Sequence, residues 1–203
     1  MMLVKPVKIN VPASALVNKE TQYELGFGDS DIRFALTLET MKNKGTGWKW
    51  NTIEYQNIYN TNWIAVTYDT NIVKLYVNLT LVYSYNGVLA GENLYYTGSI
   101  YSSNHPLRLG TRDLDFDSVT DSFQKFYLYF LMIYNRPLQQ EEVKYNIRNP
   151  YNPIRNGLIL YVNPFSIVGN KVYDFSSENL IGRNYNTIVN IKTKVLFEYS
   201  TVV

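Results

Sequence analysis

The longest apolar run in the chain, Phe-Tyr-Leu-Tyr-Phe-Leu-Met-Ile-Tyr at 126–134, is only nine residues long. A membrane-spanning helix needs about 20 apolar residues, so this run cannot cross a bilayer as a helix. Its side chains are apolar at both odd and even positions and many are aromatic, which is typical of a strand that is buried on both faces. We therefore expect residues 126–134 to form a central strand, sealed between two stacked sheets.

Shorter segments alternate apolar residues with polar or small ones, as a half-buried strand does. They lie at 32–38, 63–68, 73–77 and 79–85, and Asn86-Gly87 after the last of them is a strong hairpin signal. Gly, Asn, Asp and Ser interrupt the chain every 8–12 residues or so, a spacing typical of sandwiches and barrels. The pattern predicts an all-β, antiparallel β-sandwich in which Trp63 and Leu75 belong to the core.

One segment has the signals of a helix. Pro137 stands near the first helical position, Glu141 and Glu142 follow in the early turns, and Lys144 comes later. The prolines of the segment 149–153 cannot continue a helix. We expect a single short helix at 137–146.

Charge and composition exclude several classes of function. Nineteen basic and 17 acidic residues leave a net charge of +2, too little for binding nucleic acid through a concentrated positive field. The chain contains no Cys, which excludes disulfides, cysteine–zinc sites and thiol nucleophiles. Its single His, His105, stands in a polar loop before Pro106, so we expect a loop residue there and no catalytic base. The first residues lack the apolar region of a secretory signal.

Three segments in a fixed order resemble a known family. They are Trp-Ile-Ala-Val-Thr-Tyr-Asp followed by Leu-Tyr-Val-Asn within 63–82, Pro-Leu-Arg-Leu-Gly at 106–110, and the run 123–143 that passes into Asn-Arg-Pro-Leu. Together they are similar to the laminin G-like jelly rolls of the concanavalin A-like lectin/glucanase superfamily, over roughly residues 30–150. Leu79 stands where the family usually has Gly, and Phe123-Gln-Lys replaces its Phe-x-Gly. The resemblance implies a concanavalin A-like jelly roll, and in this family such domains recognise glycans or protein partners on surfaces.

The segment after the predicted helix also resembles this family, but its opening strands. Gly-Leu-Ile-Leu-Tyr at 157–161 and Asp-Phe-Ser-Ser-Glu-Asn at 174–179 follow the helix that normally closes the domain. Either the fold is circularly permuted, or a second, abbreviated unit begins here. We favour a jelly-roll sandwich at 1–150, with residues 151–203 completing the same sandwich, because fifty residues alone make a marginal sandwich.

An acidic segment is a candidate calcium site. It contains Asp113, Asp115 and Asp117 at every second position, with Asp121 as a fourth oxygen ligand. The EF-hand pattern fails, because Ser118 and Gln124 occupy its Gly and Glu positions. A solvated acidic loop is the alternative, and no other cofactor is indicated. The Glu-x-Asp-x-Glu pattern of glycoside hydrolases with this fold is missing, so a hydrolase is the least favoured function.

Aromatic residues are the candidate ligand-binding residues. Trp48 and Trp50 flank a lysine beside a Gly-Thr-Gly turn, and Tyr95 and Tyr96 form a second pair. Flat rings with a polar edge suit both sugars and protein interfaces, although cross-strand pairing is the alternative role. The chain is thus expected to be a non-catalytic binding module for a glycan or protein surface, with viral attachment as one such role. A structural virion or appendage protein that forms homo-oligomers is the rival, and no nucleic acid partner or membrane insertion is expected.

Overall fold

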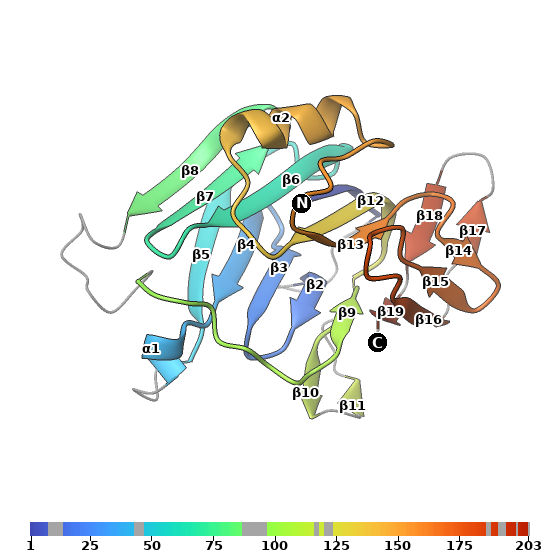
Figure 1. Cartoon of the computed structure of the whole chain (residues 1–203), viewed down its shortest axis with the longest axis horizontal. Coiled ribbons are helices and arrows are strands. Elements are labelled where there is room, and N and C mark those ends of the chain that lie inside the picture. Colours follow the sequence, from blue (N-terminus) through green and yellow to red (C-terminus); the bar gives the residue numbers. More distant parts are fainter. Residues whose placement is uncertain are drawn as a thin grey trace.

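The computed structural model describes residues 1–7, 14–42, 47–86, 97–115, 118–119, 124–185, 188–190, 194–197 and 199–202. Two antiparallel sheets stack on each other, as the jelly-roll prediction requires (Figure 1). Sheet A has the order β17 (Ile188–Asn190), β18 (Lys194–Phe197), β12 (Phe126–Tyr134), β1 (Met2–Pro6), β6 (Asn62–Tyr68), β7 (Ile72–Val77) and β8 (Thr80–Asn86), with β13 (Leu158–Val162) also paired to β12.

Sheet B forms the second layer. Its order is β14 (Ile167–Val168), β15 (Lys171–Tyr173), β16 (Ile181–Tyr185), β19 (Tyr199–Val202), β9 (Leu107–Leu109), β2 (Ser14–Lys19), β3 (Tyr23–Phe27), β4 (Asp31–Leu36) and β5 (Lys49–Glu54). A separate hairpin joins β10 (Asp113–Asp115) to β11 (Ser118–Val119). The helices are α1 (Glu39–Lys42) and α2 (Gln140–Arg148), and within the described ranges neither is long and apolar enough to span a membrane.

The main core lies between the two sheets. Alternate residues of strands such as β3, β4 and β7 point into it, and the largest fully buried residues include Phe27, Ile32, Phe34, Leu16 and Phe126. Leu75 is fully buried in the same cluster, as expected. This core accounts for the alternating segments at 32–38 and 73–77.

Strand β12 changes faces at a β-bulge. Leu3 of β1 pairs with Phe130, but its neighbour Val4 pairs with Leu128, so Tyr129 is the extra residue. Before the bulge Phe126 and Leu128 point into the main core; after it Leu131 does. Phe130 and Met132 point to the other face of sheet A, into a second buried cluster. The run is apolar at consecutive positions because both faces of β12 are covered, although the outer cover is not a second sheet as expected.

Trp63 is buried as expected, but in a different place. Its neighbour Ile64 points into the main core, so Trp63 lies on the outer face of sheet A, where it stacks on Phe130 with ring centroids 5.7 Å apart. The ring of Tyr151 packs edge-on against Phe130 from outside. The expectation that Trp63 lies between the sheets is therefore wrong, because a covered outer face buries it instead.

Helix α2 and the segment after it provide this cover. Leu138 and Val143 pack on Ala65 and Tyr76 of sheet A. The buried amide of Asn146 donates to the Tyr134 hydroxyl at 2.9 Å and accepts from the Ile154 backbone at 2.9 Å. The helix is thereby fixed to strand β12 and to the segment that follows it.

The helix begins later than predicted. Gln139 is still extended, and its backbone N–H donates to the Glu142 carboxylate at 2.8 Å, closing the first turn. Glu142 also forms an ion pair with Arg136, 2.6 Å away. Pro137 thus precedes the helix, and α2 runs to Arg148. A second helix, α1, was not expected from the sequence.

Strands beyond residue 150 pair with earlier strands. Leu131–Tyr134 of β12 pairs with β13, and Phe126–Leu128 pairs with β18. In sheet B, β19 joins β16 to β9. Both layers of the sandwich therefore contain strands from either side of α2.

Candidate functional site

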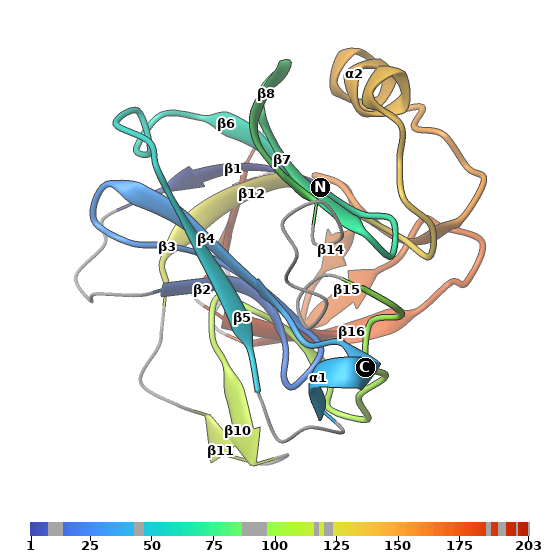
Figure 2. The same ribbon diagram turned by 90° about the vertical axis from the view of Figure 1, so that its left-hand side faces the viewer.

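The two outer faces of the sandwich differ. Helix α2 lies over sheet A, on the opposite side of the molecule from the β10–β11 hairpin (Figure 2). The outer face of sheet B is crossed by a row of side chains in cross-strand register. Ala35 lies between Trp50 and Glu24, and Asn18 lies between Glu24 and Arg108. Because Phe34 and its partners point into the core, this row points outward.

At the Trp50 end of this row, Trp50 lies beside Trp48 and near Arg112, which are both partly exposed; we call these three residues the tryptophan–arginine cluster. The rings of Trp48 and Trp50 have centroids 6.1 Å apart at an interplanar angle of 38°. Trp50 is 39% exposed. The Arg112 guanidinium lies 5.9 Å from the centre of the Trp48 ring, within the range of a cation–π contact.

Buried carboxylates hold the arginine in place. Arg112 Nε lies 2.9 Å from a Glu24 oxygen, and a terminal nitrogen lies 3.3 Å from Glu20. The Asn18 amide donates to both carboxylates, at 3.1 Å to Glu20 and 2.7 Å to Glu24. Because the carboxylates already hold the guanidinium in one position, a ligand that binds it causes little further loss of side-chain entropy.

Burial raises the pKa of Glu24 to about 7, although Arg112 and the Asn18 hydrogen bond act in the opposite direction. Both glutamate side chains are less than 10% exposed. Glycoside hydrolysis needs two carboxyl groups that face a cleft about 5–9.5 Å apart. Glu20 and Glu24 instead share one donor beneath Arg112, which suits a structural role.

Two of the four residues predicted to bind a ligand lie together in the structure. Trp48, just before β5, and Trp50, within it, lie side by side, whereas Tyr95 and Tyr96 lie outside the described residues. His105 lies in the loop before β9, where its carbonyl accepts a hydrogen bond from Lys19.

The acidic segment is described only in its backbone, and only in part. Asp113 and Asp115 belong to β10 and pair with Val119 and Ser118. Asp117 and Asp121 lie outside the described residues. In the part of the chain that the structure describes, no three acidic or His side chains gather as metal ligands would. The calcium site remains a prediction.

Sequence reasoning missed Arg112, Glu20, Glu24 and Asn18. They come from three separate segments, and only the strand pairing brings them together. One signal was present. In Tyr-Glu-Leu-Gly-Phe at 23–27 the polar positions are Glu24 and Gly26, so an outward-facing carboxylate could have been predicted there.

Comparison with known proteins identifies the fold. A family described as the concanavalin A-like lectin/glucanases superfamily, of laminin G type, matches residues 2–144. Among curated proteins none matches the chain.

Two solved structures share the architecture. One is a Bacteroides ovatus protein whose carbohydrate-binding role is inferred, with a TM-score of 0.65 and 13% identity over 89% of this chain and 50% of its own. Another is the binding domain of Paraclostridial Mosquitocidal Protein 1, with a TM-score of 0.52 and 13% identity over 94% of this chain and 49% of its own. This chain thus spans about half the length of each.

Proposed function

Since this chain belongs to the concanavalin A-like lectin/glucanases superfamily, we propose that it is a non-catalytic module that binds glycans through the tryptophan–arginine cluster. The family and the solved neighbours point to a binding module rather than an enzyme. The observation that carries the proposal is the pair of adjacent tryptophan rings, one of them 39% exposed, beside a fixed guanidinium.

Each part of the cluster matches part of a sugar. Pyranose rings have apolar C–H faces that pack on an indole, and hydroxyl groups that accept hydrogen bonds from a guanidinium. The charge of Arg112 is balanced by the carboxylates beneath it, so the cluster favours neutral sugars over strongly anionic ones.

A glycan array tests this proposal with two matched variants. Trp50→Ala should reduce binding to the best glycan at least tenfold, which corresponds to about 1.4 kcal/mol. Tyr145→Ala removes a similarly exposed aromatic residue (42%) from α2, on the other side of the molecule, and should leave binding unchanged. Unchanged binding by Trp50→Ala would remove the cluster from the site.

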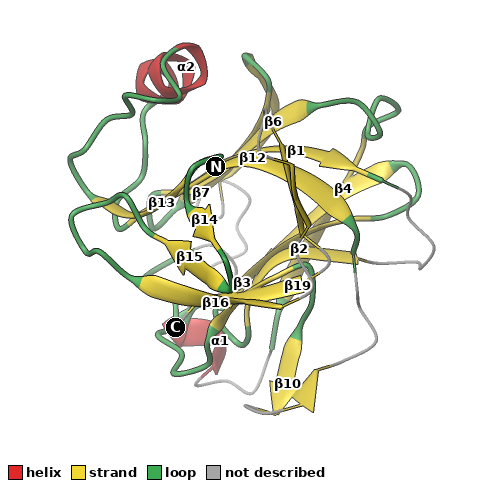
Figure 3. Ribbon diagram, turned by 90° about the vertical axis from the view of Figure 1, so that its right-hand side faces the viewer, coloured by secondary structure: helices red, strands yellow, loops and turns green. Residues whose placement is uncertain are grey.

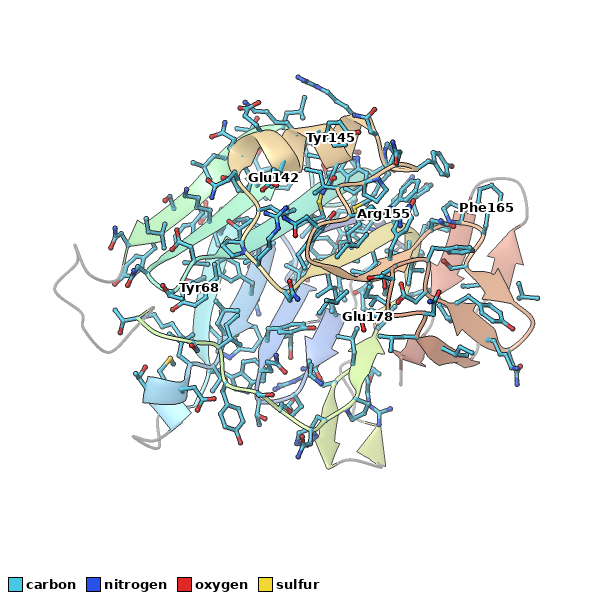
Figure 4. All side chains as sticks on the ribbon, viewed as in Figure 1. Tyr68, Glu142, Tyr145, Arg155, Phe165 and Glu178 are labelled. Atoms are coloured by element: carbon cyan, nitrogen blue, oxygen red, sulfur yellow. The ribbon has the colours of Figure 1, made fainter. Side chains whose placement is uncertain are left out.

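Assembly with a protein partner or with further copies is a second candidate function. It is favoured by exposed aromatic residues beside the covered face of sheet A: Tyr151 (61%), Phe165 (68%) and Phe175 (46%). The rings of Tyr151 and Phe165 are 6.3 Å apart, and Figure 4 shows Phe165 pointing outward at the edge of the molecule. Aromatic residues are enriched at the cores of protein interfaces.

Light scattering tests self-assembly, the form of the second candidate under which the virion or appendage role falls. Self-assembly predicts a fixed oligomer that persists on dilution and that Phe165→Ser dissociates. A monomer at all concentrations would exclude self-assembly through this patch.

A further inference from the structure

A cavity of about 650 Å³ lies between the two sheets. Its lining includes the ends of β6 and β12, the segment that leads into α2 and the segment that leads into β9. The arrangement of β6, β12 and α2 can be followed in Figures 1 and 3. Tyr68, at the end of β6 and labelled in Figure 4, lines the cavity. The volume falls within the range of about 300–1,000 Å³ that is usual for small-molecule sites.

The walls of the cavity are mainly apolar side chains that the fold leaves only partly buried. They come from both sheets and from the segment before β9: Tyr23, Leu25, Val66, Tyr68, Ile100 and Ile133. All pack against the main core, yet none is fully buried. Protein interiors are normally close-packed, and water gains few hydrogen bonds in an apolar space. Filling this cavity with an apolar group would therefore complete the core.

One charged group in the wall has an unused binding capacity. The Lys19 ammonium donates to the His105 carbonyl at 2.7 Å, and no carboxylate of the described residues lies within ion-pair distance of it. Partial burial lowers its pKa by desolvation, so an anion beside it would be stabilising.

The other charged residues of the wall have partners. Arg136 pairs with Glu142, and the Glu24 carboxylate is held by Arg112. Asp69 accepts hydrogen bonds from the backbone of Asn71 and Ile72 in its own turn. The Met1 amine also lines the cavity, but it donates to the Met132 carbonyl at 2.7 Å, and burial lowers its pKa to about 5, so it carries little charge at neutral pH. Among the described residues that line the cavity, Lys19 is thus the cation left for a ligand.

We propose that this cavity binds a single-chain amphiphile with one anionic head group, such as a medium-chain fatty acid. The acyl chain contacts the apolar walls between the sheets, and the head group pairs with the Lys19 ammonium. The site is separate from the tryptophan–arginine cluster, because that cluster lies on the outer face of sheet B and the cavity lies on its inner face.

Calorimetric titration with dodecanoate and with 1-dodecanol tests both halves of the proposal. The anion should bind with a stoichiometry of one and at least tenfold more tightly than the neutral alcohol. Lys19→Met should abolish this preference, whereas Lys171→Met, at an exposed lysine of β15, should preserve it. Equal affinity for the two ligands, or a preference that Lys19→Met leaves intact, would overturn the role of Lys19.

A second variant tests whether the acyl chain of the ligand lies in the cavity. Val66→Phe adds bulk within the cavity and should weaken dodecanoate at least tenfold, while Trp50→Ala should leave it unchanged. If Val66→Phe does not fold, Leu25→Phe fills the cavity from the opposite sheet. Failure of the unmodified protein to bind dodecanoate, or undiminished binding by a folded filled variant, would overturn the proposal.

Discussion

The outer faces of the two sheets use tryptophan in opposite ways. On sheet A, Trp63 is 8% exposed and lies beneath aromatic residues and the segments around α2. On sheet B, Trp50 is 39% exposed beside a charged cluster. The same side chain stabilises the fold where other segments cover it, and can contact a partner where it is exposed, as Trp50 is. Exposure of a large apolar group together with fixed polar groups is what distinguishes a binding face.

Removing the segment after α2, which helps to cover sheet A, should have the largest effect on the stability of the fold. We propose that residues 151–203 complete the same sandwich as residues 1–150, because β13 and β18 pair with β12 and β19 pairs with β9. A chain that ends at Asn152 would expose one edge of β12 together with Phe130 and Trp63, and it should fail to fold cooperatively. Circular dichroism during thermal unfolding measures this. A truncated chain with an undiminished melting temperature would instead support a separate second unit.

The two tryptophans give the next largest contrast. Trp63→Ala should lower the free energy of unfolding by about 3–5 kcal/mol, because it leaves a cavity against Phe130. Trp50→Ala should lower it by less than about 1 kcal/mol, as is usual for surface positions. Urea unfolding of both variants measures the difference. Equal losses would contradict the assignment of one covered and one open face.

Glu24 offers a smaller, pH-dependent effect on the open face. Its pKa is about 7 in the folded chain and near 4.5 when exposed, so between these values the folded state holds a proton that the unfolded state has released. Stability should therefore fall as pH rises from about 4.5 to 7, by up to about 3 kcal/mol at ~1.4 kcal/mol per pH unit.

The matched variant isolates this effect. Glu24→Gln keeps the shape of the side chain and removes its titration, so its unfolding free energy should change less over the same pH window. Identical pH profiles of the two proteins would show that another group is responsible.

Several strands were predictable because apolar and polar residues alternate along them. The alternation at 32–34 and 73–75 follows from burial of Ile32, Phe34, Val73 and Leu75 in the main core, with Arg33 and Lys74 on the other face. The position of Trp63 was not predictable, since a strand covered on both sides has no polar face to fix its orientation. Nor was the bulge at Tyr129, which depends on the register between β1 and β12.

The candidate site was predictable only where it is local in sequence. Trp48 immediately precedes β5 and Trp50 is its second residue, so their proximity follows from a separation of two residues in an extended segment. Arg112 and Glu24 are 88 residues apart, and their ion pair depends on how β9 aligns with β2 and β2 with β3. The inter-sheet cavity depends on the packing of whole layers and has no signature in the sequence.

The indole N–H signals of the three tryptophans test the central claim most directly, because each reports on one face. Nuclear magnetic resonance would follow them while the protein is titrated with the glycan that the array selects. The account predicts that the signals of Trp48 and Trp50 shift progressively while that of Trp63 stays in place. Binding that shifts Trp63 alone, or that leaves all three signals unmoved, would contradict it.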